Sequence, residues 1–317
     1  MFERLKAAST LFARAVSRPH IAVLVLRERG WRDVFAAIAC AEHPTVASIV
    51  SDLQSQLPAT LENLRSWYRG VRIVPDADEH LYKVRLPGGE AFLIRRSRAW
   101  QDLGTLHDVF AQGIYAHHPP VAGKTVLDIG ASIGDTAVYF AQRGARVTAY
   151  EPDPEMCALA RRNVEGNGLR ADIRAAGVGA QTQTLRLSAT HDGADSTSAT
   201  LFPDDALAGS GIAAADPSHT ASLPVSVVAL ADALAELGSV HLLKIDCQGC
   251  EYPALRSLTR AQLRAVAHVI MEFHGAPIEL EAKLRACGFS VRRKGTMYLY
   301  ADRGDELDRR DPTAPSA

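Results

Sequence analysis

Val126-Leu-Asp-Ile-Gly-Ala-Ser-Ile-Gly-Asp-Thr136 is the stretch of the sequence that decides the fold. An apolar run ends in an acidic residue, two glycines follow four residues apart, and helix-compatible residues come next. This pattern is typical of a buried strand, a tight glycine turn and the start of a helix, which form the first βα unit of a nucleotide-binding α/β sheet. Glycines at such a turn let a ligand approach the backbone where a Cβ would collide.

The spacing of the glycines and the next acidic residue indicate the kind of ligand. Glu151 follows Gly130 by about 20 residues, the separation at which a carboxylate can accept hydrogen bonds from a ribose. A dinucleotide needs Gly-x-Gly-x-x-Gly against its pyrophosphate, whereas this turn has Gly-x-x-x-Gly followed by Asp135, whose carboxylate would repel a phosphate. S-adenosylmethionine fits, because it carries a ribose, an ammonium and a sulfonium without a phosphate. The alternative is an ordinary Rossmann-like turn that binds another ligand or none.

The composition of the whole chain argues against a nucleic-acid-binding protein, a membrane-spanning protein and a disulfide-rich protein. Its 317 residues are 47% hydrophobic and 22% charged, and 35 basic and 36 acidic residues give a net charge of −1. These values are typical of a soluble globular protein and indicate no nucleic-acid partner. No apolar run approaches the ~20 residues of a transmembrane helix, and no signal peptide is recognisable. Five cysteines, an odd number in a long chain, argue against a disulfide framework and favour a cytoplasmic location.

Periodicity divides the chain into two parts. Residues 1–70 show apolar positions at three- and four-residue spacing and predict a helical N-terminal extension, which covers a substrate or joins copies into a homo-oligomer. Residues 71–317 then form an α/β domain, which begins with a predicted β-hairpin over residues 81–95 and ends with another over residues 289–300. Residues 188–222 hold few large apolar side chains and predict a loop insertion. That insertion either closes over a substrate or is a tolerated surface feature.

A set of polar residues is expected where two neighbouring strands end. Ligands of a parallel sheet bind at the carboxyl ends of its strands. Because side chains alternate along a strand, Lys244 and Asp246 share one face, and so do Glu272 and His274. We expect Lys244 to lie beside Glu272, deeper in the site, and Asp246 beside His274, at its mouth.

This set of residues suits methyl transfer to a hydroxyl group. A histidine with a near-neutral pKa can take the proton of the acceptor, and an aspartate can orient it. In a second interpretation, Asp246, Glu272 and His274 hold a divalent cation that lowers the pKa of the acceptor; we do not favour it. In a third, Lys244 and Glu272 form only a structural ion pair.

The pair Cys247-x-x-Cys250 invites a zinc or redox interpretation. No second cysteine pair stands at zinc spacing, so a structural zinc site is unsupported. A thioredoxin-like motif would follow the first strand of a different pattern. We therefore interpret these two cysteines as incidental to the chemistry.

Taken together, these motifs resemble the FkbM family of methyltransferases. The matching pieces are residues 81–95, 113–115, 126–136, 151–152, 163 with 167–168, 243–251 and 270–274. The resemblance covers about residues 80–300, and Lys-Ile-Asp-x-x-Gly-x-Glu over residues 244–251 is its most specific part. It implies a class I methyltransferase (Rossmann-like) α/β fold, with a mostly parallel sheet and a C-terminal antiparallel hairpin.

The resemblance also implies an activity. S-adenosylmethionine would be the cofactor, and a hydroxyl of a saccharide or natural-product-type small molecule would be the acceptor. An N-methyltransferase and a non-catalytic cofactor-binding or scaffold subunit are the alternatives. The N-terminal extension and the insertion lie outside the shared pattern, so they give no information on the substrate.

The candidate site residues fall into two groups. Those expected to bind the cofactor are Asp128, Gly130, Ala131, Gly134, Asp135, Glu151, Pro152 and Val178, the last at the end of a third strand predicted over residues 172–178, which should flank the adenine. Those expected near the acceptor are Asp246, His274 and, from the resemblance alone, Glu251, with Lys244 and Glu272 as further candidates. The chain departs from the family at Gly179 and Ala180, where members often carry an acidic residue.

Overall fold

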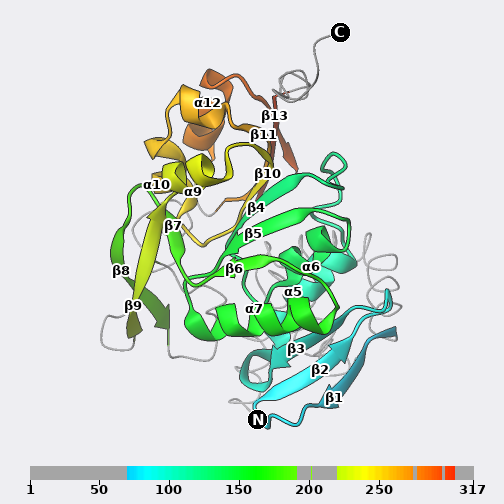
Figure 1. The fold of residues 1–317 in the computed structure, drawn as a ribbon. Coiled ribbons are helices and arrows are strands. Elements are labelled where there is room, and N and C mark those ends of the chain that lie inside the picture. The colour runs from blue at the N-terminus through cyan, green and yellow to red at the C-terminus, as the bar shows by residue number, and fades with distance from the viewer. Residues whose placement is uncertain (1–69, 191–200, 202–219, 274–276, 295–296, 304–317) are drawn as a thin grey trace, which may run out of the picture. The chain divides into compact units, whose positions relative to one another are not determined.

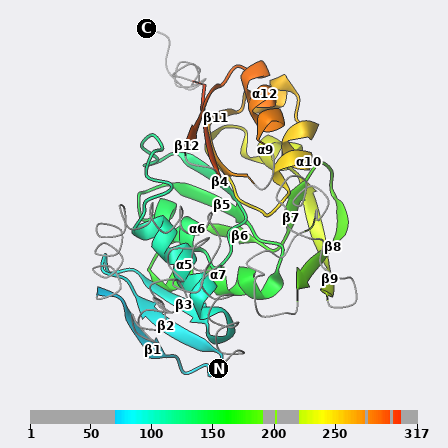
Figure 2. The same ribbon diagram turned by 180° about the vertical axis from the view of Figure 1, so that it is seen from behind.

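The computed structural model describes residues 70–190, 201, 220–273, 277–294 and 297–303. The chain divides into two compact units between Gly104 and Thr105, and each is considered by itself. The predicted helical extension of residues 1–70 lies outside the described residues except for Gly70. Figures 1 and 2 show the path of the chain from opposite sides.

The first unit contains a small antiparallel sheet. Its strands are β1 (Arg72–Pro75), β2 (Leu81–Arg85) and β3 (Ala91–Arg95), in the order β1-β2-β3. Pairing of β2 with β3 in antiparallel register confirms the predicted hairpin. A short 3-10 helix, Arg96–Arg98, and helix α5, Ala99–Phe110, follow. The buried carboxylate of Asp102 ties this helix to the sheet, because it accepts hydrogen bonds from the backbone and guanidinium of Arg95 at 2.6–3.1 Å.

The second unit is built on a seven-stranded sheet. Its strands are β4 (Thr125–Ile129), β5 (Arg146–Tyr150), β6 (Asp172–Arg174), β10 (Val240–Ile245), β11 (Val266–Glu272), β12 (Ser290–Lys294) and β13 (Tyr298–Asp302). They lie in the order β12-β13-β11-β10-β4-β5-β6, with β13 antiparallel to both of its neighbours and β11, β10, β4, β5 and β6 parallel. The predicted fold class is confirmed: the sheet is Rossmann-like, mostly parallel, and ends in an antiparallel hairpin.

Helices cover both faces of this sheet. They are α6 (Asp135–Ala141), α7 (Pro154–Gly166), α9 (Leu230–Leu237), α10 (Glu251–Ser257), α11 (Arg260–Leu263) and α12 (Ile278–Ala286). In Figures 1 and 2, α6 and α7 lie on one side, and α9, α10 and α12 lie on the other. Alternate strand residues such as Ile129, Ile245 and Met271 form a core with Leu255 of α10 and Leu284 of α12. The opposite set of strand positions, which includes the polar ones, therefore faces α6 and α7.

The third strand differs from the prediction. Instead of one strand over residues 172–178, β6 ends at Arg174, and β7 (Gly177–Gly179) pairs with β9 (Thr220–Ala229) in a separate sheet of order β7-β9-β8. The sequence prediction joined two short strands because their apolar residues follow one another with hardly a break. Val178 is consequently buried in the hydrophobic core.

The insertion is also shorter at both ends than predicted. Strand β8 (Gln183–Thr190) pairs with β9 as far as Thr190 opposite Thr220, so residues 188–190 and 220–222 belong to strands. Small polar residues can form a ladder because its hydrogen bonds come from the backbone, and the loop prediction counted only large apolar side chains. Of the rest of the insertion, the structure describes only Leu201.

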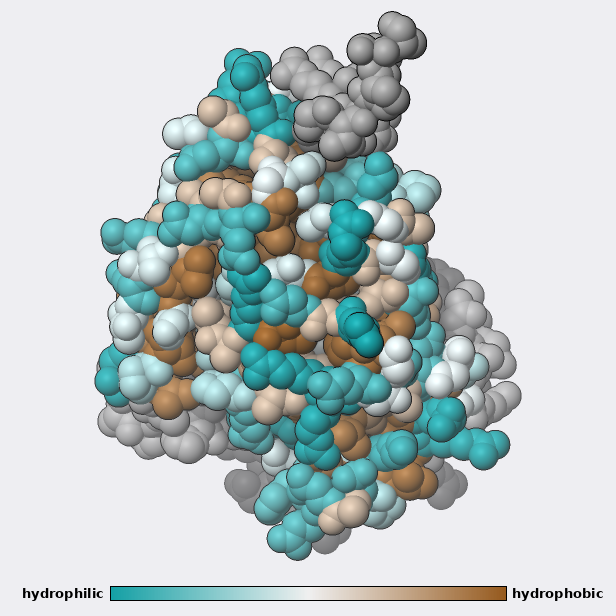
Figure 3. All heavy atoms as spheres, viewed as in Figure 1, coloured by the Kyte–Doolittle hydropathy of each residue, from teal (hydrophilic) through white to brown (hydrophobic). Residues whose placement is uncertain are grey.

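The visible surface is mixed in character. On the face seen in Figure 3, hydrophilic side chains separate small groups of hydrophobic ones. Among the described helices, none combines the length and the apolar content needed to cross a bilayer. The scattered exposure of single apolar residues, such as Ile278 at 72%, is normal for a protein surface.

Candidate active site

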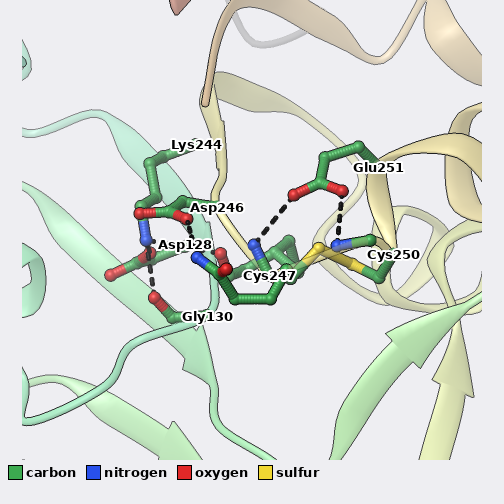
Figure 4. The surroundings of a disulfide bond; sticks show 10 residues. Asp128, Gly130, Lys244, Asp246, Cys247, Cys250 and Glu251 are labelled. Carbon is green, nitrogen blue, oxygen red and sulfur yellow. Dashed lines mark hydrogen bonds and ion pairs between the residues drawn. A yellow bond between two sulfur atoms is a disulfide. The ribbon is translucent and has the colours of Figure 1, made fainter. Parts of the chain in front are cut away.

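The candidate site is formed where β4 and β10 end side by side. The two strands are parallel, with Asp128 in register with Lys244. After them the backbones stay in contact, since the amide of Asp246 donates to the carbonyl of Ile129 at 3.0 Å. A Cβ added to Gly130 would lie only 1.8 Å from the carbonyl oxygen of Asp246. The glycine turn after β4 and the turn after β10 therefore pack directly on each other (Figure 4).

Lys244 pairs with Asp128, and the predicted pairing with Glu272 is wrong. Its Nζ lies 2.9 Å from Asp128 Oδ1 and donates to the carbonyl of Gly130 at 2.6 Å (Figure 4). The reason is register: β11 places Ile270, not Glu272, opposite Lys244, and Glu272 stands two residues further along, roughly 6–7 Å away along the strand. The side chains of the pair are 2% and 0% exposed.

The charges of this pair are matched inside the protein. Burial opposes the charge of the Lys244 ammonium, but the carboxylates of Asp128, Asp246 and Asp135 outweigh it and raise the pKa of Lys244. Thr136 Oγ1 donates to the second oxygen of Asp128 at 2.5 Å. Both oxygens of Asp128 are thus engaged by protein groups, and the pair anchors the glycine turn.

Asp135, the first residue of α6, is a buried carboxyl group with an unused oxygen. Its Oδ1 has no hydrogen-bond partner among the described residues. Burial raises the pKa of Asp135 to about 7, against the opposing effect of Lys244. A buried, unsatisfied polar atom is costly, so this oxygen is suited to a ligand that supplies a donor or a positive charge.

Glu151 is the second buried carboxyl group at this edge. Its two oxygens accept hydrogen bonds from the amides of Ser132 at 2.8 Å and Asp153 at 3.0 Å. Burial raises the pKa of Glu151 to about 7, although these two bonds oppose the shift. Ser132 adopts the left-handed conformation with φ +48°, and the bond from its amide helps to hold that conformation. Each oxygen keeps a lone pair that could accept a ribose hydroxyl.

The other predicted cofactor residues have varied surroundings. Ala131 is buried, and its amide donates to the carbonyl of Tyr150. Gly134 has φ +84°, and a Cβ there would lie 2.9 Å from the backbone of Ala160 in α7. Pro152 is half-buried. Gly134 therefore also serves the packing of two helices, a role that the spacing of the glycines did not reveal.

Asp246, which is predicted to lie near the acceptor, follows the last residue of β10. Its oxygens receive long hydrogen bonds from Tyr115 at 3.5 Å and Gln248 at 3.3 Å. The Tyr115 side chain is buried, and burial together with the charges of Asp246 and Glu272 raises its pKa well above the usual value. Burial and Glu272 likewise raise the pKa of Tyr298, which stands opposite Glu272 in the sheet.

Sequence reasoning missed both tyrosines as site residues. Tyr115 lies in residues 113–115, which match the family pattern, and this match could have identified it. Nothing in the sequence identifies Tyr298, because its position beside Glu272 depends on the register of the C-terminal hairpin. His274 lies outside the described residues, so its predicted pairing with Asp246 stays a prediction.

Glu251 shapes the turn that follows Asp246. Its fully buried carboxylate accepts hydrogen bonds from the amides of Cys247 at 3.2 Å and Gly249 at 2.7 Å (Figure 4). Contrary to the expectation from the cysteine count, Cys247 and Cys250 form a disulfide across this turn. An odd count leaves one cysteine over, but it does not prevent a local bridge between two neighbours.

The divalent-cation interpretation gains no support from the described part of the chain. There, no three histidine, cysteine or carboxylate side chains are arranged to hold a metal ion. The predicted set of Asp246, Glu272 and His274 includes a residue outside that part. That interpretation stays a prediction.

Comparisons with known proteins relate the chain to methyltransferases. The model of the methyltransferase FkbM domain matches residues 128–291, slightly more than half of the 317 residues. The ubiquinone biosynthesis O-methyltransferase of Methylocella silvestris is 44% identical over 55 residues, which are 17% of this chain and 22% of that protein. Methyltransferase sdnD of Sordaria araneosa is 26% identical over 192 residues, 53% of this chain and 74% of that protein. A solved structure of magnesium protoporphyrin IX methyltransferase from Synechocystis with bound S-adenosylmethionine is 14% identical, with a TM-score of 0.37 over 66% of this chain and 88% of that one.

Proposed function

The chain belongs to the FkbM family of methyltransferases, and we propose that it methylates a hydroxyl group of a saccharide or natural-product-type small molecule. Membership in the family confirms the enzyme class and the cofactor predicted from the sequence, a methyltransferase that uses S-adenosylmethionine. The hydroxyl acceptor agrees with the O-methylation named for one relative, over the 55 residues that the two share.

One observation carries the proposal. The glycine turn after β4 and Asp246 after β10 are in backbone contact at the carboxyl edge of the sheet. This contact brings the residues suited to the cofactor beside a carboxylate suited to handling a proton. Transfer of a methyl group requires the donor and the acceptor to be bound next to each other, and a nearby carboxylate can take the proton of the acceptor.

The residues present fit the cofactor. When bound, S-adenosylmethionine supplies a methyl group activated by a positively charged sulfur. The unused oxygen of Asp135 would be satisfied by a cationic group of this ligand, and Glu151 has lone pairs free for ribose hydroxyls. The ion pair of Lys244 with Asp128 holds the carbonyl of Gly130 and so keeps the turn in shape.

On the acceptor side, Asp246 orients the attacking hydroxyl and takes part in removal of its proton. Tyr115 donates a hydrogen bond to one oxygen of Asp246, and the charge of Asp246 contributes to the raised pKa of the nearby Lys244 ammonium. An ionised carboxylate accepts a hydrogen bond from the substrate hydroxyl and increases its nucleophilicity.

Binding of S-adenosylmethionine is expected to strengthen as pH rises through 7. Asp135 and Glu151 have pKa values of about 7, so both are mostly protonated at pH 6 and ionised at pH 8. A cationic ligand prefers the ionised carboxylates, and each group that must ionise weakens binding at pH 6 about tenfold relative to pH 8. Isothermal titration calorimetry in buffers of different ionisation enthalpy measures both the affinity and the protons released.

The matched control for this measurement is Asp135→Asn. This variant should release one proton fewer on binding and should keep only the part of the pH dependence that comes from Glu151. The folded state of the protein at both pH values is checked by circular dichroism. Failure of the folded protein to bind S-adenosylmethionine at pH 8 would refute the proposed function. An affinity that does not change with pH would refute the roles of these two carboxyl groups.

Replacement of Asp246 by Asn is expected to lower kcat by about 100-fold or more, because general-base assistance typically contributes that much. The affinity for S-adenosylmethionine should change by less than about threefold, since the isosteric amide keeps the backbone contact with the glycine turn. Methyl transfer from radiolabelled cofactor to a panel of hydroxylated small molecules supplies the assay. Asp232→Asn, at an exposed carboxylate of α9, should keep full activity. An Asp246→Asn enzyme with unchanged kcat would remove this residue from the mechanism.

A further inference from the structure

We propose that Cys247 and Cys250 form a redox-active site, whose disulfide orders the turn after β10 and thereby strengthens the binding of S-adenosylmethionine. The inference rests on the proposed function for its ligand. It replaces the interpretation of the two cysteines as incidental.

The disulfide lies directly beside the candidate active site. Cys247 is the next residue after Asp246, and the bridge to Cys250 closes the turn before α10 begins (Figure 4). Cys250 is buried at 2% exposure, whereas Cys247 is partly exposed. Cys247 is therefore the cysteine of the pair that lies nearer to solvent.

The turn that the disulfide closes is held in an unfavourable conformation. Gln248 has φ +57°, a left-handed value that is uncommon for a residue other than glycine, and Gly249 has φ +115°. The disulfide acts against relaxation of the turn, and so do the hydrogen bonds from the turn to Glu251 and from Gln248 to Asp246. Reduction would remove the disulfide and leave the hydrogen bonds.

Relaxation of this turn would change the position of the residues expected to bind the cofactor. Gln248 donates to one oxygen of Asp246, so a change at Gln248 alters the position of that carboxylate. The carbonyl of Asp246 stands against Gly130 without room for a Cβ, and the Asp246 amide is bonded to Ile129. Such close packing transmits displacements. The turn of the disulfide and the glycine turn therefore move together.

The chemical step is thiol–disulfide exchange with a dithiol reductant. A thiolate of the reductant attacks Cys247 Sγ, the bond between the two cysteines breaks, and the Cys250 thiolate leaves and takes up a proton. The second thiol of the reductant then attacks the mixed disulfide and releases Cys247 as a thiol. The protein gains two electrons and two protons, and the dithiol becomes a disulfide.

The size of the closed loop favours a reversible role over a purely structural one. A disulfide stabilises a fold less when the loop it closes is short, and this loop joins residues only three positions apart. The other cysteines of the described part, Cys157 and Cys287, are free and buried. In that part, the pair beside Asp246 forms the one disulfide, and Cys247 is its partly exposed member.

The test uses reciprocity between ligand binding and redox state. The full chain is equilibrated in buffers of reduced and oxidised dithiothreitol, its free thiols are alkylated, and the oxidised fraction is counted by mass spectrometry with and without saturating S-adenosylmethionine. We expect the disulfide form to bind the cofactor at least about fivefold more tightly than the dithiol form. Saturating cofactor should then move the midpoint potential about 20 mV in the reducing direction. Calorimetry on each form checks the affinities directly.

Variants separate this effect from other actions of the reductant. The double variant Cys247→Ser/Cys250→Ser should bind with the affinity of the dithiol form and no longer respond to dithiothreitol, while Cys287→Ser should behave as the parent chain does. Equal affinities of the two forms, with no shift in potential, would overturn the redox proposal alone. Tighter binding by the dithiol form would overturn it as well. Absence of binding in both forms would overturn the proposed function, and the redox proposal with it.

Discussion

Replacement of Lys244 by Met is expected to lower the free energy of unfolding by about 3–5 kcal/mol, because it leaves the Asp128 carboxylate buried without its counter-ion. That carboxylate is 0% exposed, and among the described residues the hydroxyl of Thr136 is the donor that it keeps. The same change removes the hydrogen bond from Nζ to the carbonyl of Gly130. We therefore also expect weaker binding of S-adenosylmethionine by the fraction that stays folded. Urea denaturation followed by circular dichroism measures the stability.

A second variant shows whether the loss comes from the unpaired charge. Asp128→Asn combined with Lys244→Met keeps an acceptor for Thr136 and removes both charges, so it should recover about 2 kcal/mol or more relative to Lys244→Met alone. Arg256→Met serves as the comparison at the surface. It breaks the exposed pair with Glu279 and should cost about 1 kcal/mol or less. A Lys244→Met protein as stable as Arg256→Met would show that the buried pair adds nothing to the fold.

The pair of Lys244 with Asp128 also shows how far the sequence could predict the site. The alternation of side chains along a strand correctly placed Lys244 on the face that carries polar groups. It could not choose between the two neighbouring strands as the source of the partner, because that choice depends on register, and β4, which supplies the partner, lies more than 100 residues before β10. The sheet itself was predictable because buried parallel strands are continuous apolar runs with sharp ends.

The regions that the sequence predicted poorly have weak local signals. Apolar residues recur from Ile173 to Val178, so the break between β6 and β7 is visible only when their different pairing partners are known. Tyr115 reaches the site through the tertiary fold, as its bond to Asp246 crosses 131 positions of sequence. The disulfide was missed for another reason: the sequence gives the spacing of the two cysteines but not their oxidation state.

Gly130→Ala is expected to be the most damaging single-methyl change at the site. Its φ of +82° already disfavours any residue with a Cβ, and the added Cβ would lie 1.8 Å from the carbonyl oxygen of Asp246. A backbone atom cannot rotate away, so the ends of β4 and β10 must separate. That separation disrupts the bond from the Asp246 amide to Ile129 and the bond from Lys244 to Gly130. We expect the free energy of unfolding to fall by more than about 4 kcal/mol, a loss that few single substitutions reach.

Gly123→Ala is the matched control, because Gly123 has a similar φ of +69° but no atom within 4 Å of the added Cβ. It should lose only about 1–2 kcal/mol, the cost of the left-handed backbone, and bind S-adenosylmethionine as the parent chain does. The comparison of the two variants shows whether Gly130 serves cofactor binding alone or also the packing of the two strand ends. If the glycine served only to let a ligand approach the backbone, Gly130→Ala would be as stable as Gly123→Ala and would lose cofactor binding alone. If it joins the two strand ends, as the contact with Asp246 indicates, stability and binding fall together.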